Sequence, residues 1–258
     1  MSFLHTFRPS PIAFNLGLLK VHWYGLFIVS GFLLGLFLVL KRSRAYGLEK
    51  KKIFDLSFYL LIFGLLGARI YYLLLFPGYF FSHPLEIFKV WQGGLGIYGA
   101  VLAGLLVLYF YARKHQIFYL SLLDLIVPAL ILGQAIGRFG NYFNRELFGL
   151  PTDLPWGIPI NGNFYHPCFL YESFWNFGVF LILMILERKK SAKRVPGQIF
   201  SFYLFLYPLG RFFIEFLRID NQPIFFNLYF SQYLSLALIF VGVYLLSRLR
   251  PKTKAQTL

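Results

Sequence analysis

The chain has 258 residues, of which 58% are hydrophobic and 14% are charged, and its mean hydropathy is +0.64. This balance excludes an ordinary soluble domain and is typical of a polytopic membrane protein. The formal net charge of +15 would suggest nucleic-acid binding in a soluble protein, but basic residues flank the cytoplasmic ends of membrane spans. We therefore expect one membrane domain over residues 1–258, with no nucleic acid among its partners. The single cysteine, Cys168, excludes an internal disulfide.

Seven apolar stretches are long enough, or nearly so, to cross a hydrocarbon core that needs about 20 residues. They show no strict alternation of apolar and polar residues, so helices are expected rather than the strands of a barrel. The expected fold class is all-α, with about seven transmembrane helices at 21–40, 53–76, 95–111, 120–136, 169–186, 199–217 and 228–246. The first twenty residues lack a signal-peptide pattern, so the first span is expected to direct insertion.

The lysines and arginines predict the orientation of these helices. Of the 25 basic residues, 17 fall in the connections 41–52, 113–116 and 187–197 and in the tail from 248. Such residues are retained on the cytoplasmic side, so the N-terminus is expected outside and the C-terminus in the cytoplasm. Loops 137–168 and 218–227 then face outward.

Four arginines lie at the outer end of the membrane, where this orientation gives no reason for positive charge. They are Arg138, Arg145, Arg211 and Arg218. An anionic ligand is the simplest explanation for them.

In chain order, the first span begins with Trp23, Tyr24 and Gly25, at the interface where aromatic belts form. Arg69 lies inside the second span, where a charge costs about 2.5–3.5 kcal/mol and usually faces a cavity or a partner. Its candidate partners are Asp124 and Glu146, and both a structural ion pair and a catalytic role are open.

The third span opens with the glycine-rich stretch 91–99, which permits a tight turn or the close approach of a lipid. The fourth span carries Asp124, Pro128 and Gln134, and is therefore polar enough to line an interior. Pro128 is expected to kink it.

Residues 137–149 bring two arginines, a glutamate, two asparagines and three glycines into this apolar chain. Forked guanidinium groups suit a phosphate or a carboxylate, and the glycines allow a ligand to come close. We interpret this stretch as a catalytic or anion-binding rim at the membrane surface. The alternative is a helix end with ordinary interfacial arginines that reach lipid headgroups.

The sixth span carries a polar stripe with a spacing of four, four and three residues, which places its members on one helical face. They are Tyr207, Arg211, Glu215 and Arg218. Such a stripe within lipid should face the bundle interior. An intrahelical ladder of ion pairs that neutralises itself is the alternative.

Residues 137–149 closely resemble the signature of the prolipoprotein diacylglyceryl transferases, roughly G-R-x-G-N-x-x-N-x-E-x-x-G. The matching residues are Gly137, Arg138, Gly140, Asn141, Asn144, Glu146 and Gly149. Further similarities run from Tyr24 to Arg218 and include the pattern H-P-x-x-L-Y-E at 166–172 and the stripe of the sixth span. Tyr98 stands where the family commonly has histidine, which weakens any mechanism with imidazole as the base. His166, the first residue of the pattern at 166–172, is expected to cap a helix, and Cys168 is not expected to be a nucleophile.

The resemblance implies transfer of a diacylglyceryl group from phosphatidylglycerol to the lipobox cysteine thiol of a prolipoprotein signal peptide. A thioether forms and glycerol phosphate leaves, as the first step of bacterial lipoprotein maturation. The implied location is the cytoplasmic (inner) membrane, among membrane lipids, with a multi-pass chain and an active site toward the outer face. No cofactor or metal is expected.

The roles expected in this reaction follow the charges and the resemblance. Arg211 is expected to be catalytic by stabilising the departing phosphate, and Tyr98 by positioning or hydrogen bonding. Expected to bind substrate are Arg138, Tyr24, Asn141, Glu146, Gly149, Tyr207 and Glu215. A transporter or channel with arginines along its pathway is the competing class, but the inverted repeats and broken helices typical of transporters are not evident. A purely structural subunit would leave the polar residues unexplained.

Overall fold

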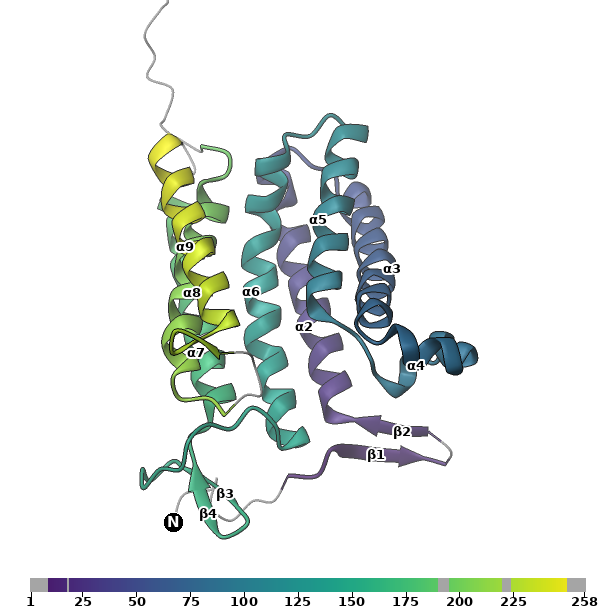
Figure 1. The fold of residues 1–258 in the computed structure, drawn as a ribbon. Coiled ribbons are helices and arrows are strands. Elements are labelled where there is room, and N and C mark those ends of the chain that lie inside the picture. Colours follow the sequence, from purple (N-terminus) through teal and green to yellow (C-terminus); the bar gives the residue numbers. More distant parts are fainter. Residues whose placement is uncertain (1–8, 18, 190–194, 220–223, 250–258) are drawn as a thin grey trace, which may run out of the picture. The chain divides into compact units, whose positions relative to one another are not determined.

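The structure is a computed structural model that describes residues 9–17, 19–189, 195–219 and 224–249 (Figure 1). Lys193 and the central part of the predicted loop 218–227 lie outside the described residues. The described chain is predominantly helical, as predicted.

All seven predicted stretches are helices, and most boundaries agree within a few residues. They are α2 (Trp23–Arg42), α3 (Lys50–Leu75), α5 (Ile97–Lys114), α6 (Tyr119–Asn144), α7 (Cys168–Lys189), α8 (Gln198–Glu215) and α9 (Phe230–Arg248). The main difference is at α6, which continues eight residues beyond the expected end at 136. Residues 137–144, the first part of the signature, are therefore helical. Their polar side chains are compatible with a helix end where they find hydrogen-bond partners.

Six of these helices are long and apolar enough to cross a membrane, which supports a multi-pass membrane protein. They are α2, α3, α5, α6, α7 and α9. Helix α8 is not among them, because its tyrosines, Pro208, Arg211 and Glu215 lower its mean hydropathy. A seventh span and the orientation of the termini stay predictions.

Three antiparallel hairpins and one short helix were not predicted. The hairpins pair β1 (Ile12–Leu16) with β2 (Leu19–His22), β3 (Ile158–Ile160) with β4 (Asn163–Tyr165), and β5 (Ile224–Phe225) with β6 (Leu228–Tyr229). The short helix is α4 (Pro77–Ser82). In the β3–β4 hairpin, Asn161 and Gly162 have φ of 50° and 88°, as a two-residue turn between twisted strands requires. Strands this short carry too weak an alternation to be read from sequence.

The chain divides into two compact units, Met1–Leu38 with Ile126–Leu258 and Val39–Leu125, and each is described by itself. In the second unit α3 packs along α5, and their backbones meet at two glycines. A Cβ on Gly67 would lie 2.6 Å from the carbonyl oxygen of Gly99. Small residues at a helix contact let backbones approach closely, which is a common means of packing in membranes. The single membrane domain stays a prediction.

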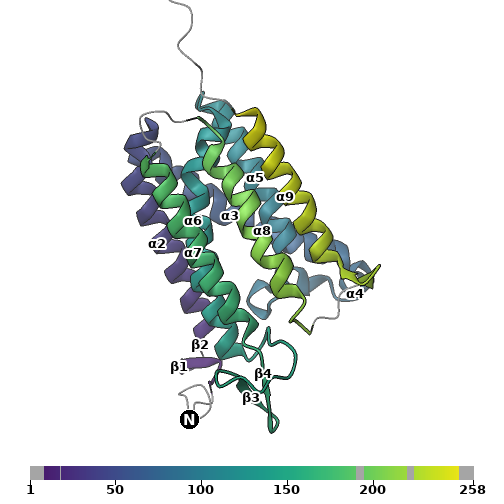
Figure 2. The same ribbon diagram turned by 90° about the vertical axis from the view of Figure 1, so that its left-hand side faces the viewer.

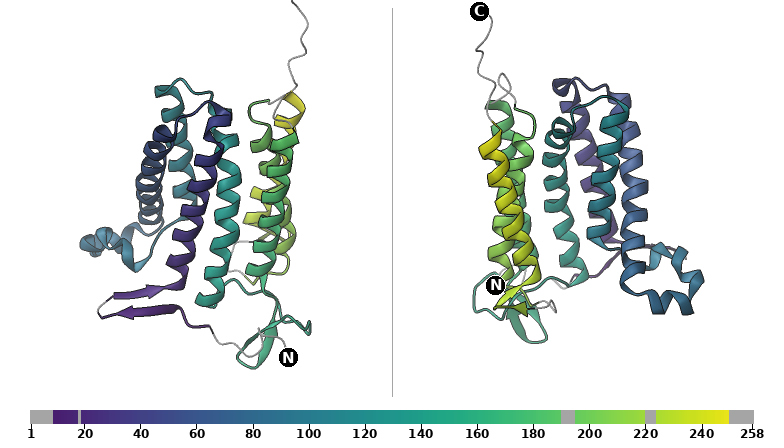
Figure 3. Two further views of the ribbon diagram at one scale, coloured as in Figure 1. Left: turned by 180° about the vertical axis from the view of Figure 1, so that it is seen from behind. Right: turned by 45° about the horizontal axis from the view of Figure 1, so that its top comes forward.

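In the first unit α8 packs against both α7 and α9, and α8 and α9 lie side by side in both views of Figure 3. Helices α6 and α7 are also neighbours (Figure 2), because the Ser173 hydroxyl of α7 donates to the carbonyl oxygen of Ala135 on α6 at 2.8 Å. Apolar side chains of α6, α7 and α8 form the core, among them Val127, Ile131, Val179, Leu183 and Leu204. The three helices that carry the polar residues of interest thus share one core.

Candidate active site

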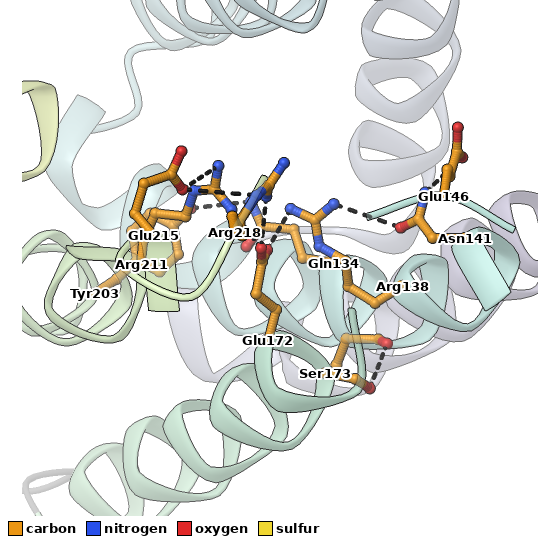
Figure 4. Close-up of polar contacts among 11 residues, drawn as sticks. Gln134, Arg138, Asn141, Glu146, Glu172, Ser173, Tyr203, Arg211, Glu215 and Arg218 are labelled. Atoms are coloured by element: carbon orange, nitrogen blue, oxygen red, sulfur yellow. Dashed lines mark hydrogen bonds and ion pairs between the residues drawn. The ribbon is translucent and has the colours of Figure 1, made fainter. Parts of the chain in front are cut away.

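Five charged side chains from α6, α7 and the end of α8 meet in the first unit (Figure 4). We call this group the ionic cluster. Its members are Arg138 on α6, Glu172 on α7, Arg211 and Glu215 on α8, and Arg218 three residues beyond that helix. The stripe predicted on the sixth span therefore extends to two other helices, and it is not a ladder confined to α8.

Glu172 is the centre of the ionic cluster. Its Oε2 lies 2.5 Å from Nη2 of Arg138, and its Oε1 accepts from Nη1 of Arg218 at 2.8 Å and from Nη1 of Arg211. The side chain of Glu172 is only 3% exposed. One carboxylate therefore serves three guanidinium groups.

Glu215 is the second carboxylate of the ionic cluster and pairs with two of the same arginines. Its Oε2 lies 2.7 Å from Nη2 of Arg211 and 3.8 Å from Nε of Arg218. Because Glu215 is completely buried, losing its partners would leave an uncompensated charge in a poorly solvated site. Arg211 is thus fixed between two carboxylates, Glu172 and Glu215.

The arginines differ in their access to a ligand. The side chain of Arg138 is 25% exposed, that of Arg211 is 15% exposed and that of Arg218 is 6% exposed. Arg138 is also bound to fewer carboxylates than Arg211. It is therefore the arginine best able to turn part of its fork toward an anion.

The C-terminal turn of α6 forms a second polar group, which Figure 4 shows next to Arg138. Nη1 of Arg138 donates to Oδ1 of Asn141 at 3.5 Å, and Nδ2 of Asn141 donates to Oε1 of Glu146 at 2.7 Å. Asn144 donates to the same oxygen at 3.3 Å. Three residues of the signature are thus joined to the ionic cluster through Arg138. Arg145 is not part of this group, because its Nε donates to the carbonyl oxygen of Pro9 at 3.0 Å.

Two signature glycines allow close packing beside these groups. A Cβ on Gly140 would lie 2.6 Å from Cδ2 of Tyr24, so this glycine lets the tyrosine lie against α6 next to Asn141. The backbones of Gly149 and Arg218 form an isolated antiparallel β-bridge. A Cβ on Gly149 would lie 2.5 Å from Sγ of Cys168. Direct binding of substrate by Tyr24 and Gly149 stays a prediction.

Tyr207 lies one helical turn from Arg211, as its spacing predicted. Its ring stacks on that of Tyr203, with centroids 5.4 Å apart and an angle of 7° between the planes. The Tyr203 hydroxyl in turn accepts a hydrogen bond from Nε2 of Gln134 on α6 at 3.3 Å. Polar side chains therefore continue along α8 beyond the ionic cluster.

One of the two candidate partners of Arg69, Asp124 in the same unit, is wrong, and Glu146 in the first unit stays an open candidate. Arg69 is 7% exposed and donates to backbone carbonyl oxygens of its own unit. Its contacts are Nε to Ile87 at 2.9 Å, Nη1 to Gly93 and Gly94 at 2.9 and 3.0 Å, and Nη2 to Glu86. A guanidinium presents five donors, so it can hold several carbonyls of an irregular segment at once. Arg69 therefore orders the connection between α3 and α5.

Tyr98 belongs to the second unit, at the beginning of α5. Its side chain is 46% exposed, and its ring meets that of Tyr71 edge-on with centroids 6.0 Å apart. Its role in catalysis stays a prediction. Among the described residues, no group of three or more His, Cys, Asp and Glu side chains could hold a metal ion.

The family model described as prolipoprotein diacylglyceryl transferase matches residues 11–248. The chain belongs to this family. Among its relatives, phosphatidylglycerol–prolipoprotein diacylglyceryl transferase of Thermosynechococcus vestitus is 38% identical, with 94% of both chains covered. The enzyme of that name from Synechococcus elongatus is 41% identical over 91% of this chain and 86% of its own. The one from Bacillus licheniformis is 38% identical over 96% and 95%.

Glu172 is the residue of this diacylglyceryl transferase family member that sequence reasoning missed. It was recognised only as part of the pattern H-P-x-x-L-Y-E and was given no role. A carboxylate five residues into an apolar helix was the available signal, because such a charge usually has a partner in the bundle. Its three partners could not be named, since they lie 34 to 46 positions away in sequence.

The residues around the start of α7 are buried or in contact with other side chains. Cys168 is completely buried, in agreement with the expectation that it is not a nucleophile. The ring of His166 meets the hydroxyl of Tyr171 at 3.1 Å, and Trp156 donates to the same hydroxyl at 2.8 Å. The His166 ring is thus in contact with a side chain, whereas a cap on the helix end had been expected.

Proposed function

We propose that this chain transfers the diacylglyceryl group of phosphatidylglycerol to the lipobox cysteine thiol of a prolipoprotein signal peptide. Membership of the family and the names of its relatives support both substrates. The observation that carries the proposal is the ionic cluster, in which Glu172 alone serves three arginines at the end of apolar helices. Such a site suits an anionic group on a lipid.

The chemistry needs stabilisation of a departing phosphate. The thiolate sulfur attacks a glycerol carbon, the bond from this carbon to the phosphate oxygen breaks, and glycerol phosphate leaves with that electron pair. Negative charge grows on the phosphate as the bond breaks, so a fixed cation aimed at it lowers the barrier. The thiol must lose its proton first, and positive surroundings favour that loss.

Arg138 and Arg211 divide this work in our proposal. Arg138 holds the phosphate of the bound lipid, because it is the more exposed of the two and can exchange Glu172 for a phosphate oxygen. Arg211 stabilises the phosphate as it leaves, because two carboxylates hold its guanidinium in place before the lipid arrives. Preorganised donors need no rearrangement during the reaction.

The other predicted residues complete the site in this proposal. Asn141 and Glu146 bind the polar headgroup beside Arg138, and Glu215 keeps Arg211 in position. Tyr98 positions a substrate by hydrogen bonding and takes no proton. Tyr24, Gly149 and Tyr207 line the bound substrates.

We further propose that α8 is a seventh span and that the site opens to the outer face of the bacterial cytoplasmic membrane. The basic residues support this orientation, and Arg211 of α8 pairs with Glu172 on α7, as expected of a polar span inside a bundle. Single cysteines at Asp153 and Lys193 in a Cys168→Ala background test it. Only the first should react with an impermeant reagent added from outside, and the opposite result would reverse the site's orientation.

The function is tested by mass spectrometry. Purified protein is incubated with phosphatidylglycerol vesicles and a peptide that contains a lipobox cysteine. A peptide product heavier by one diacylglyceryl group, together with released glycerol phosphate, is expected. A matched peptide with serine in place of cysteine should stay unmodified. Absence of the adduct with a folded, lipid-binding protein would reject the transferase proposal.

A further inference from the structure

Two amide side chains lie one helical turn from the ionic cluster, on α6 and α7, and one of them is hydrogen-bonded to a tyrosine of α8. Gln134 precedes Arg138 by four residues on α6, and Asn176 follows Glu172 by four residues on α7. Residues four apart share a helical face. We call Gln134, Asn176 and Tyr203 the amide layer, because Tyr203 on α8 is hydrogen-bonded to Gln134. Figure 4 shows Gln134 and Tyr203 beside the ionic cluster.

Asn176 has an unused donor in this layer. Its side chain is 2% exposed, and its Nδ2 has no hydrogen-bond partner among the residues that the structure describes. The amide of Gln134 uses only one end: Nε2 donates to Tyr203, and within the same described residues the buried Oε1 is unpaired. Buried polar groups are normally satisfied, and leaving one unpaired costs about 1–3 kcal/mol. Two amides with unpaired buried atoms, each one helical turn from the ionic cluster, therefore point to a ligand.

The order of side chains along α6 and α7 indicates which part of a lipid this ligand is. Charged residues come first, then the amide layer, then apolar residues such as Ile131 and Val179 of the core. One helical turn, about 5.4 Å, separates the first two. A glycerophospholipid has the same order: the phosphate, then the ester carbonyls one glycerol unit deeper, then the acyl chains. Ester carbonyls accept hydrogen bonds, as an amide NH2 group requires.

We propose that Asn176 and Gln134 form a subsite for the acyl ester carbonyls of the lipid substrate. This inference rests on the proposed function, since it assigns the diacylglycerol part of the same lipid. Nδ2 of Asn176 donates to one ester carbonyl. Gln134 donates to the other after its amide turns, so that Tyr203 donates to its oxygen. The subsite sets the depth of the glycerol carbon relative to the arginines and selects ester-linked over ether-linked lipids.

The test compares phosphatidylglycerol with its dialkyl ether analogue, which keeps the phosphate and headgroup but lacks both carbonyls. With unaltered protein, kcat/KM should be about tenfold or more lower for the ether lipid, as expected for lost hydrogen bonds of this kind. Asn176→Leu should lower kcat/KM for the ester lipid and leave the ether lipid nearly unchanged. The ester-to-ether ratio should therefore fall several-fold. Thermal stability should not drop, because an unpaired amide is replaced by an apolar group.

Ser173→Ala is the matched control. Ser173 is 3% exposed and lies three residues before Asn176 on α7, but its hydroxyl is already satisfied by Ala135. Its removal should change stability and leave the ester-to-ether ratio as in the unaltered protein. If Asn176→Leu does not fold, Gln134→Met tests the same subsite from α6 and should lower the ratio about threefold or more.

Two negative results would have different meanings, one for the subsite and one for the proposed function. An unchanged ratio in an active Asn176→Leu or Gln134→Met protein would overturn the subsite and leave the transferase function intact. An unaltered protein that makes no adduct from ester-linked phosphatidylglycerol would overturn the proposed function itself, and the subsite with it.

Discussion

Two arginine sites in this protein have opposite surroundings. Arg69 in the second unit gives its donors to neutral backbone carbonyls, whereas Arg138 and Arg211 in the first unit are paired with carboxylates from other helices. A backbone carbonyl oxygen is fixed by the main chain. A ligand cannot replace it as the partner of Arg69 without unfolding the segment that carries it. A carboxylate oxygen is close in charge and shape to a phosphate oxygen, so a lipid phosphate can take its place. The partner, more than the arginine, separates a structural site from a binding site.

We expect the largest effect from Arg211→Gln, which tests an arginine of the carboxylate-bound site. Because we propose that Arg211 stabilises the departing phosphate, kcat and kcat/KM should fall together by about 100- to 1,000-fold, equal to about 2.7–4 kcal/mol. Lipid affinity should change little. Single-turnover rates and lipid binding measure the two quantities separately.

Arg145→Gln is the matched control for that experiment. This arginine also belongs to the signature stretch 137–149, but it donates to the carbonyl of Pro9 and is outside the ionic cluster. Its rate should stay within a few-fold of the unaltered protein. Near-normal turnover of Arg211→Gln would remove that residue from the mechanism.

Arg138→Lys tests whether the forked geometry matters as well as the charge. Lysine offers a point charge on a flexible stem and cannot grip a phosphate through two parallel hydrogen bonds. We expect affinity for phosphatidylglycerol to fall by about 10- to 100-fold, equal to about 1.4–2.8 kcal/mol. Titration with lipid vesicles measures it. Full binding by the lysine variant would mean that charge alone suffices at this position.

Arg69→Met should separate stability from activity. The change leaves the carbonyls of Ile87, Gly93 and Gly94 without their donor, so the free energy of unfolding should fall by about 3 kcal/mol. The rate per folded molecule should stay within about twofold. Thermal unfolding measures the stability, and turnover per folded molecule measures the activity.

The control is Arg113→Met, at an exposed arginine of α5 in the same unit, which should cost less than about 0.5 kcal/mol. A large loss of turnover in folded Arg69→Met would break the comparison, since it would give the carbonyl-bound arginine a part in the reaction.

Tyr98→Phe has the smallest expected effect. The resemblance puts Tyr98 where the family commonly has histidine, and a phenol is a poorer base than an imidazole at neutral pH. Turnover should fall by about tenfold or less, with a clear residual rate in steady-state assays. Complete loss of turnover with normal lipid binding would instead put the hydroxyl on the proton path.

The amino-acid sequence by itself determined the positions of the seven helices and the residues of the signature. Both are local properties: an apolar run long enough for lipid, and a set of residue types at short fixed spacings. The stripe of α8 was readable for the same reason, because residues three and four apart share a face of one helix. The family resemblance then added the reaction.

Only the tertiary structure decided which charges meet. Glu172 gathers arginines 34 to 46 positions away, and Arg69 donates to backbone carbonyls and not to the candidate Asp124. The extension of α6 to Asn144 depends on Asn141 and Glu146 bonding to each other at its end. Such pairings depend on how helices are rotated and packed against one another. No single stretch of sequence carries that information, because hydrophobicity and spacing fix a helix without fixing its neighbours.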